Sequence, residues 1–171
     1  MPTYVSLLRA VNVGGTGKLP MDRLKAMCAD AGFAAIRTYI ASGNVVFDTD
    51  ETEYEVRAKL EAKLEEYAGT PVGVIVRSAA EMTELISRNP FANEPGNRVM
   101  VLFSDFPLPS DPLQGASGIK DEQVRLGRRE LFIFYPDGQA DTRLRLPSMK
   151  TGTARNMNTV SKIAVMTGCQ L

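Results

Sequence analysis

The chain has 171 residues, 44% of them hydrophobic and 23% charged, and its 20 lysines and arginines balance its 20 aspartates and glutamates. This is the composition of an ordinary globular protein, and a net charge of zero argues against a dedicated DNA-binding protein, which usually carries a basic face. The sequence contains no histidine, which excludes Ser-His-Asp and Cys-His catalysis and removes the commonest metal ligand.

The two cysteines, Cys28 and Cys169, predict neither a metal site nor a catalytic nucleophile. Neither belongs to a Cys-x-x-Cys pair, the spacing typical of structural zinc sites. Cys28 shares a helical spacing with Leu24, Met27 and Ala31, so we expect its thiol to lie in the core. We therefore expect no structural metal and no cofactor.

The apolar runs are too short to predict a membrane span. The N-terminus reads MPTYVSLLRAVNV, which lacks a charged leader region and predicts a strand rather than a signal peptide. We expect a cytoplasmic protein with no membrane partner.

The first half of the chain predicts the order strand, helix, strand, strand, helix, strand. The strands are expected at residues 3–12, 36–41, 44–48 and 72–77, and the helices at residues 21–31 and 52–67. In the second helix one apolar stripe is predicted, formed by Val56, Leu60, Leu64 and Tyr67. This order is that of the ferredoxin-like split βαβ fold.

The second half repeats part of this order. We expect a helix at residues 80–88, strands at 99–103, 123–127 and 131–135, and a last helix at 158–167 that ends at Gly168. The sequence thus predicts an α+β protein in which two ferredoxin-like halves with antiparallel sheets pack into one compact molecule. The expected domains are residues 1–78, a connecting helix and linker at 79–97, and residues 98–171.

A glycine-rich stretch, VNVGGTGKLP at residues 11–20, resembles a phosphate-binding loop only in part. The P-loop template requires a glycine where this chain has Asn12 and a hydroxyl where it has Leu19. We interpret the stretch as a turn between a strand and a helix, in which Lys18 offers at most a weak anion contact.

The C-terminal segment concentrates positive charge. After Asp141 there is no acidic residue, whereas five cations follow: Arg143, Arg145, Lys150, Arg155 and Lys162. Asn156, Asn158 and Thr159 are candidate N-cap residues of the last helix, and a helix N-terminus attracts anions.

We therefore predict an anion site for a phosphate, a carboxylate or a nucleic-acid backbone. Its expected residues are Lys150, Thr153, Arg155, Asn156, Asn158 and Thr159. The alternative is a helix cap whose neighbouring cations are solvated or paired with acids elsewhere in the fold.

Polar residues near the first sheet form a second, weaker hypothesis. Arg9 alternates with Leu7 and Val11, so it points to the face of the apolar residues. The functional interpretation is a polar pocket of Arg9, Asn12, Lys18, Ser42 and Asn44. The structural interpretation, which we prefer, has Arg9 bridging the two halves and Asn44 serving a hairpin turn.

Several motifs together resemble the bacterial family known as domain of unknown function 1697. In chain order they are LLRAVNVGG, RTYIASGNVVF, VIVRS, NPF, FYPDG and ARNMNTVSKI. The resemblance implies two ferredoxin-like halves and implies no activity. The chain departs from the family pattern at Met157, where an aromatic residue is usual, and at Met149-Lys150, where the family carries Gly-Thr.

We expect a non-catalytic protein that binds an anionic partner, a phosphate-containing ligand or nucleic acid, at the basic C-terminal segment. Such binding should be sensitive to salt. The alternative is an enzyme acting on a small phosphorylated or carboxylated metabolite in a cleft between the halves. The cleft would contain Arg9 and at least one carboxyl group with a perturbed pKa, and proton transfer would fall to Asp, Glu, Lys or Tyr.

Overall fold

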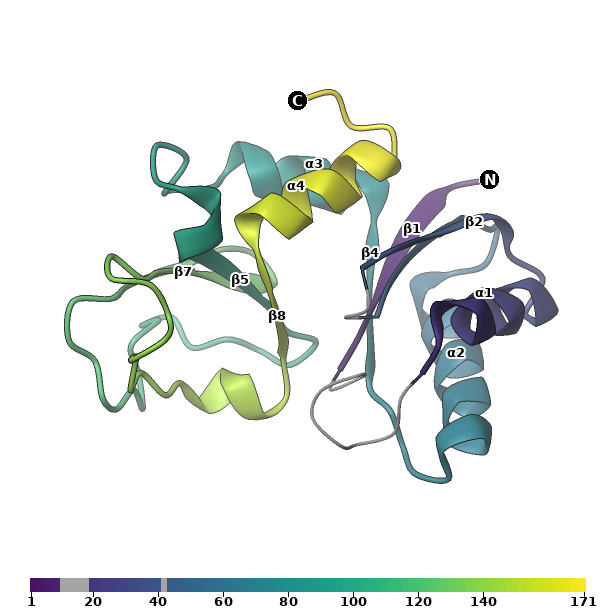
Figure 1. Ribbon diagram of the computed structural model, residues 1–171, viewed down its shortest axis with the longest axis horizontal. Helices are drawn as coiled ribbons and strands as arrows, with labels where there is room; N and C mark the ends of the chain where they lie inside the picture. Colours follow the sequence, from purple (N-terminus) through teal and green to yellow (C-terminus); the bar gives the residue numbers. More distant parts are fainter. Residues whose placement is uncertain (10–18, 41–42) are drawn as a thin grey trace. The chain divides into compact units, whose positions relative to one another are not determined.

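The computed structural model describes residues 1–9, 19–40 and 43–171 (Figure 1). Within these ranges the chain forms two four-stranded antiparallel sheets and four α-helices, an α+β fold, so the predicted fold class is confirmed. Clustering of contacts divides the chain into a first unit, Met1–Thr83 with Ile163–Leu171, and a second unit, Glu84–Lys162. The domain bounds at residues 78 and 98 stay a prediction.

The sheet of the first unit has the strand order β2-β3-β1-β4, which is the ferredoxin-like order. Its strands are β1 (Thr3–Leu8), β2 (Ala34–Tyr39), β3 (Asn44–Asp48) and β4 (Val74–Ser78). Two helices, α1 (Met21–Asp30) and α2 (Glu53–Ala68), lie on one side of this sheet (Figure 1).

The core of the first unit lies between this sheet and its two helices. Alternate strand residues such as Leu8, Phe47 and Val76 meet buried helix residues such as Leu24 and Leu60. The predicted stripe of α2 is confirmed at Val56, Leu60 and Leu64, each at most 1% exposed, whereas Tyr67 at the helix end is 40% exposed. Burial of each such leucine contributes about 1.5–3 kcal/mol of stability.

The sheet of the second unit has the order β6-β7-β5-β8, the same order with each number raised by four. Its strands are β5 (Val99–Phe103), β6 (Gln123–Leu126), β7 (Glu130–Phe134) and β8 (Thr153–Asn156). A short 3-10 helix, η1 (Gly96–Arg98), precedes β5. Sequence patterns predict no strand at the residues of β8, three of which, Thr153, Arg155 and Asn156, belong to the predicted anion site.

Loops replace the two helices that the ferredoxin-like order would place on the second sheet. Both loops, residues 104–122 and 135–152, are described throughout and contain no α-helix, only the 3-10 helix η2 (Pro147–Lys150). Leu144 and Leu146 of the second loop cover the sheet where helices would otherwise pack. They form one buried cluster with strand residues of the sheet: Leu102, Leu131 and Ile133.

Two further helices, α3 (Ala79–Ser87) and α4 (Met157–Met166), follow the last strand of each sheet and repeat a local motif. Arg77 on β4 pairs with Val5, and Arg155 on β8 pairs with Val101. In both arginines Nη1 donates to the carbonyl of the preceding residue, at 2.8 Å for Arg77 and 3.0 Å for Arg155. The residue after each arginine then caps the helix, so the two units share a residue-level repeat that sequence patterns did not reveal.

Candidate functional site

Residues 143–150, hereafter the basic segment, alternate between exposed arginines and buried leucines over their first four positions. Leu144 and Leu146 are 1% and 4% exposed. Arg143, which precedes Leu144, and Arg145, which lies between the two leucines, are exposed. The backbone of Arg145 pairs with Ser117 through bonds of 2.8 and 3.0 Å, which fixes the extended path. Lys150, the last residue of η2, is also exposed. Three cations therefore face water from one short segment.

Arg155 lies inside the second sheet and does not share this exposure. It is 7% exposed, and its Nη1 donates to Thr153 Oγ1 at 2.6 Å. Burial lowers the pKa of Arg155 to about 10, which still leaves the guanidinium charged at neutral pH. Thr153 and Arg155 thus organise β8 from within.

Asn156 is the N-cap of α4. Its Oδ1 accepts a hydrogen bond from the amide of Thr159 at 2.9 Å, and Thr159 is 8% exposed. Asn158 is exposed and lies so close to Gly96 that a Cβ there would come within 2.1 Å of its Oδ1. Of the six residues predicted for the anion site, Lys150 and Asn158 are therefore the exposed ones, and Asn156 is engaged in capping.

Acidic residues lie near the start of the basic segment. Glu122 accepts hydrogen bonds from the amide of Lys120 and from Thr142 Oγ1, both at 2.9 Å, and the first of these lowers the pKa of Glu122 most. In its protonated form the Asp121 carboxyl donates a hydrogen bond to the side chain of Asp137, which raises the pKa of Asp121. Glu122 therefore places a carboxylate beside Thr142, the residue that precedes the basic segment.

The weaker pocket hypothesis falls partly outside the described residues, where Asn12, Lys18 and Ser42 lie. Arg9 is half-buried, and its amide donates to Gly73 O at 2.9 Å. Asn44 is 1% exposed and its Nδ2 donates to Tyr39 O at 3.0 Å, across the hairpin. This bond is the one that the structural interpretation requires of Asn44, and the polar pocket stays a prediction.

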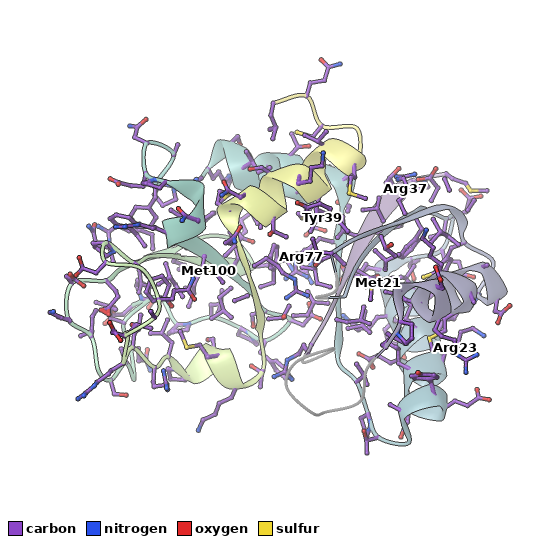
Figure 2. The ribbon with its side chains drawn as sticks, viewed as in Figure 1. Met21, Arg23, Arg37, Tyr39, Arg77 and Met100 are labelled. Atoms are coloured by element: carbon purple, nitrogen blue, oxygen red, sulfur yellow. The ribbon has the colours of Figure 1, made fainter. Side chains whose placement is uncertain are left out.

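A cavity of about 220 Å³ lies on the loop side of the second sheet, at a place that sequence patterns missed. Its lining comes from three strands and the second loop: Met100, Leu102, Ile133, Tyr135, Gln139, Met149, Gly152 and Ala154. Figure 2 shows Met100 within this unit. Apolar alternation along a strand predicts which side chains are buried. It does not predict a cavity, because a cavity depends on the paths of the loops that cover the sheet.

A wider, more open groove of about 420 Å³ lies between α1 and α2. Its lining mixes both charges, including Arg23, Asp30, Lys63 and Glu66. The guanidinium of Arg23 lies 5.1 Å from the centre of the Tyr67 ring, so the helices fill part of the groove with their own contact.

Across the described part of the chain, no three acidic or cysteine side chains gather as a metal site. Among the same residues, no helix combines the length and apolarity that crossing a bilayer requires. These observations define an α+β protein with two ferredoxin-like sheets and an exposed basic segment.

Residues 1–132 match the model of the family described as protein of unknown function DUF1697, and the chain belongs to this family. The membership inferred from the motifs is thus confirmed, and the family description assigns no activity. A solved structure described as a conserved bacterial protein from Streptococcus pneumoniae has a TM-score of 0.80 at 23% identity, covering 97% of this chain and 98% of that one. This likeness shows the fold alone. No curated protein matches the chain.

Proposed function

We propose that the protein is a non-catalytic binding protein for an anionic, phosphate-containing partner, held by the exposed cations of the basic segment. The observation that carries this proposal is the alternation in which Arg143 and Arg145 face water while Leu144 and Leu146 are buried. The leucines anchor the segment, so the cations are presented from a fixed backbone rather than from a loose tail.

The spacing of these cations suits a partner with more than one phosphate. Residues two apart in an extended chain lie about 6–7 Å from each other on the same side, so Arg143 and Arg145 project as neighbours. Lys150 follows at the end of η2. Because all three are exposed, their contacts with phosphate are screened by salt and individually weak.

Arg155 and Asn156, predicted as ligands, support this surface from inside. Arg155 fixes Thr153 and Ala154 in β8, and Asn156 fixes the start of α4. β8 follows the basic segment directly, so their contribution is to hold its C-terminal end in place.

The enzyme hypothesis receives no comparable support. It requires a perturbed carboxyl group beside Arg9, whereas the raised pKa of Asp121 is explained by its own neighbour Asp137, and both carboxyl groups are exposed.

The test is fluorescence anisotropy of a labelled single-stranded oligonucleotide, with inorganic pyrophosphate as competitor. Three contacts with phosphate predict that raising salt from 50 to 200 mM weakens binding roughly 20-fold. Lys150→Ala should weaken binding and lower the salt dependence by about one contact. Lys25→Ala, an exposed cation on α1, is the matched control and should bind as the wild type does.

Displacement by pyrophosphate at low concentration would identify a small phosphate ligand rather than a nucleic acid. Binding that Lys150→Ala and the double variant Arg143→Ala/Arg145→Ala leave unchanged would refute the proposal.

A further inference from the structure

The cavity on the second sheet exists because loops stand where the first unit has helices. On the first sheet, α1 and α2 fill the corresponding side with Leu24, Cys28, Leu60 and Leu64. On the second sheet, loop residues cover the same side and leave about 220 Å³ between Met100, Ile133 and Met149. The cavity borders the core of the unit, since Leu102, Ile133 and Tyr135 of its lining belong to the buried cluster of the second sheet.

The walls of this cavity are mostly apolar and include two polar groups. Aliphatic and thioether side chains form most of the lining: Met100, Leu102, Ile133, Met149 and Ala154. Tyr135 and Gln139 add a phenol and an amide, each able to donate and to accept a hydrogen bond. Apolar walls with a few polar groups are the usual composition of small-molecule sites.

The charges near this polar end oppose each other. Burial raises the pKa of Tyr135 most, Glu122 raises it further, and Arg145 lowers it. A carboxylate and a guanidinium therefore act on the phenol with opposite signs, and among the described residues no charged one belongs to the cavity lining to pair with a charged ligand. The phenol itself, with its raised pKa, stays protonated at neutral pH.

We propose that this cavity binds a small, neutral molecule of one ring that carries a single hydrogen-bonding group. An enclosed apolar protein cavity of about 150 Å³ holds benzene. The cavity here has about 220 Å³ and is partly open to water, since Gln139 and Ala154 of its lining are exposed, and it has room for a ring with one small substituent. The ring contacts Met100, Ile133 and Met149, and the substituent meets Gln139 and the hydroxyl of Tyr135. This site adjoins the basic segment, which supplies Met149 to the lining and Arg145 beside Tyr135, but its neutral ligand differs from the anionic partner proposed above.

The test is NMR of the protein labelled at its methionine methyl groups. Met100 and Met149 line the cavity, whereas Met21 on α1 does not and serves as an internal reference (Figure 2). Titration with benzamide should shift the Met100 and Met149 signals and leave Met21 in place. Benzoate should bind at least five-fold more weakly than benzamide, because its charge gains nothing in this setting.

Two variants keep the test decisive. Ala154→Leu, at an exposed position of β8 that lines the cavity, fills the space and should weaken benzamide at least ten-fold. Ala92→Leu, exposed in the same unit and outside the lining, is the control. Gln139→Ala, at an exposed loop position, should weaken benzamide and leave toluene binding unchanged.

No shift at either methionine with benzamide, or equal binding by Ala154→Leu, would overturn the proposal. Tighter binding of benzoate than of benzamide would overturn the neutral ligand class.

Discussion

Arg37 joins a strand to the end of a helix within the first unit. Its Nη1 donates to Ala35 O at 2.7 Å, and its Nη2 donates to Met166 O at 3.1 Å. Ala35 has a φ of 51° at a bulge in the β2–β3 pairing, and Met166 ends α4. A cation is favourable at the C-terminus of a helix because the last carbonyls carry partial negative charge. One side chain thus stabilises both a strained strand and the helix end.

Replacing Arg37 should loosen the C-terminal residues. Arg37→Ala removes both bonds, so we expect a loss of about 1–2 kcal/mol of stability and faster hydrogen exchange at the amides of Thr167 and Cys169. Arg57→Ala, which removes an exposed pair with Glu53, is the control and should cost at most about 0.5 kcal/mol. Unchanged exchange at Thr167 would show that Arg37 does not hold the helix end.

Cys28 should be inert in the folded protein. It is fully buried, and burial raises the pKa of its thiol to about 12, so the reactive thiolate is scarce at pH 8. Cys169 is only half-buried. An aromatic disulfide reagent should therefore titrate one thiol quickly in native protein and two in denaturant, and Cys169→Ser should abolish the fast reaction. Rapid labelling of Cys28 in the native state would contradict this assignment.

At the scale of elements, the start of α2 was predictable because two residues close in the sequence, Thr52 and Glu55, cap it. Thr52 Oγ1 accepts from the Glu55 amide at 3.2 Å, and Glu55 Oε2 accepts from the Thr52 amide at 3.1 Å. This capping box also has a recognisable sequence pattern. By contrast, β8 is a four-residue strand, TARN, whose alternation places polar Thr153 and Arg155 inward, so a hydrophobic period cannot reveal it.

The capping box gives a direct stability prediction. Thr52→Ala leaves the Glu55 amide without its cap, so unfolding in urea should show a loss of about 0.5–2 kcal/mol with an unchanged slope. Thr70→Ala, at an exposed position after α2, should lie within about 0.5 kcal/mol of the wild type. Equal effects of the two substitutions would show that the cap contributes nothing to α2.

At the scale of the whole molecule, one plan is used twice. Both sheets have the same strand order, and each ends in a buried arginine followed by a capped helix. Figure 2 shows Arg77 on the side of its sheet away from α1. The plan was predictable in outline because element order follows from periodicity. The candidate site was only partly predictable, because the burial of Arg155 depends on the register of β8 and the exposure of Lys150 on the path of η2.

The repeat predicts parallel behaviour of its two arginines. Arg77→Ala and Arg155→Ala each empty a buried volume and should cost about 2–5 kcal/mol. Arg77→Met and Arg155→Met keep most of the apolar stem and should cost about 1.5 kcal/mol or less. Thermal unfolding of the four variants tests this order. If alanine cost more stability than methionine at one position and less at the other, the two arginines would share a backbone position but not a role in stability.

The most direct test of the central claim is a titration of isotopically labelled protein with pyrophosphate, followed by amide NMR at 50 mM salt. Shifts at residues 143–150 that shrink at 200 mM salt, and that need more pyrophosphate in Lys150→Ala than in the wild type, are the predicted result. An unperturbed basic segment, or a titration that Lys150→Ala leaves unchanged, would contradict the assignment of an anion surface to these cations.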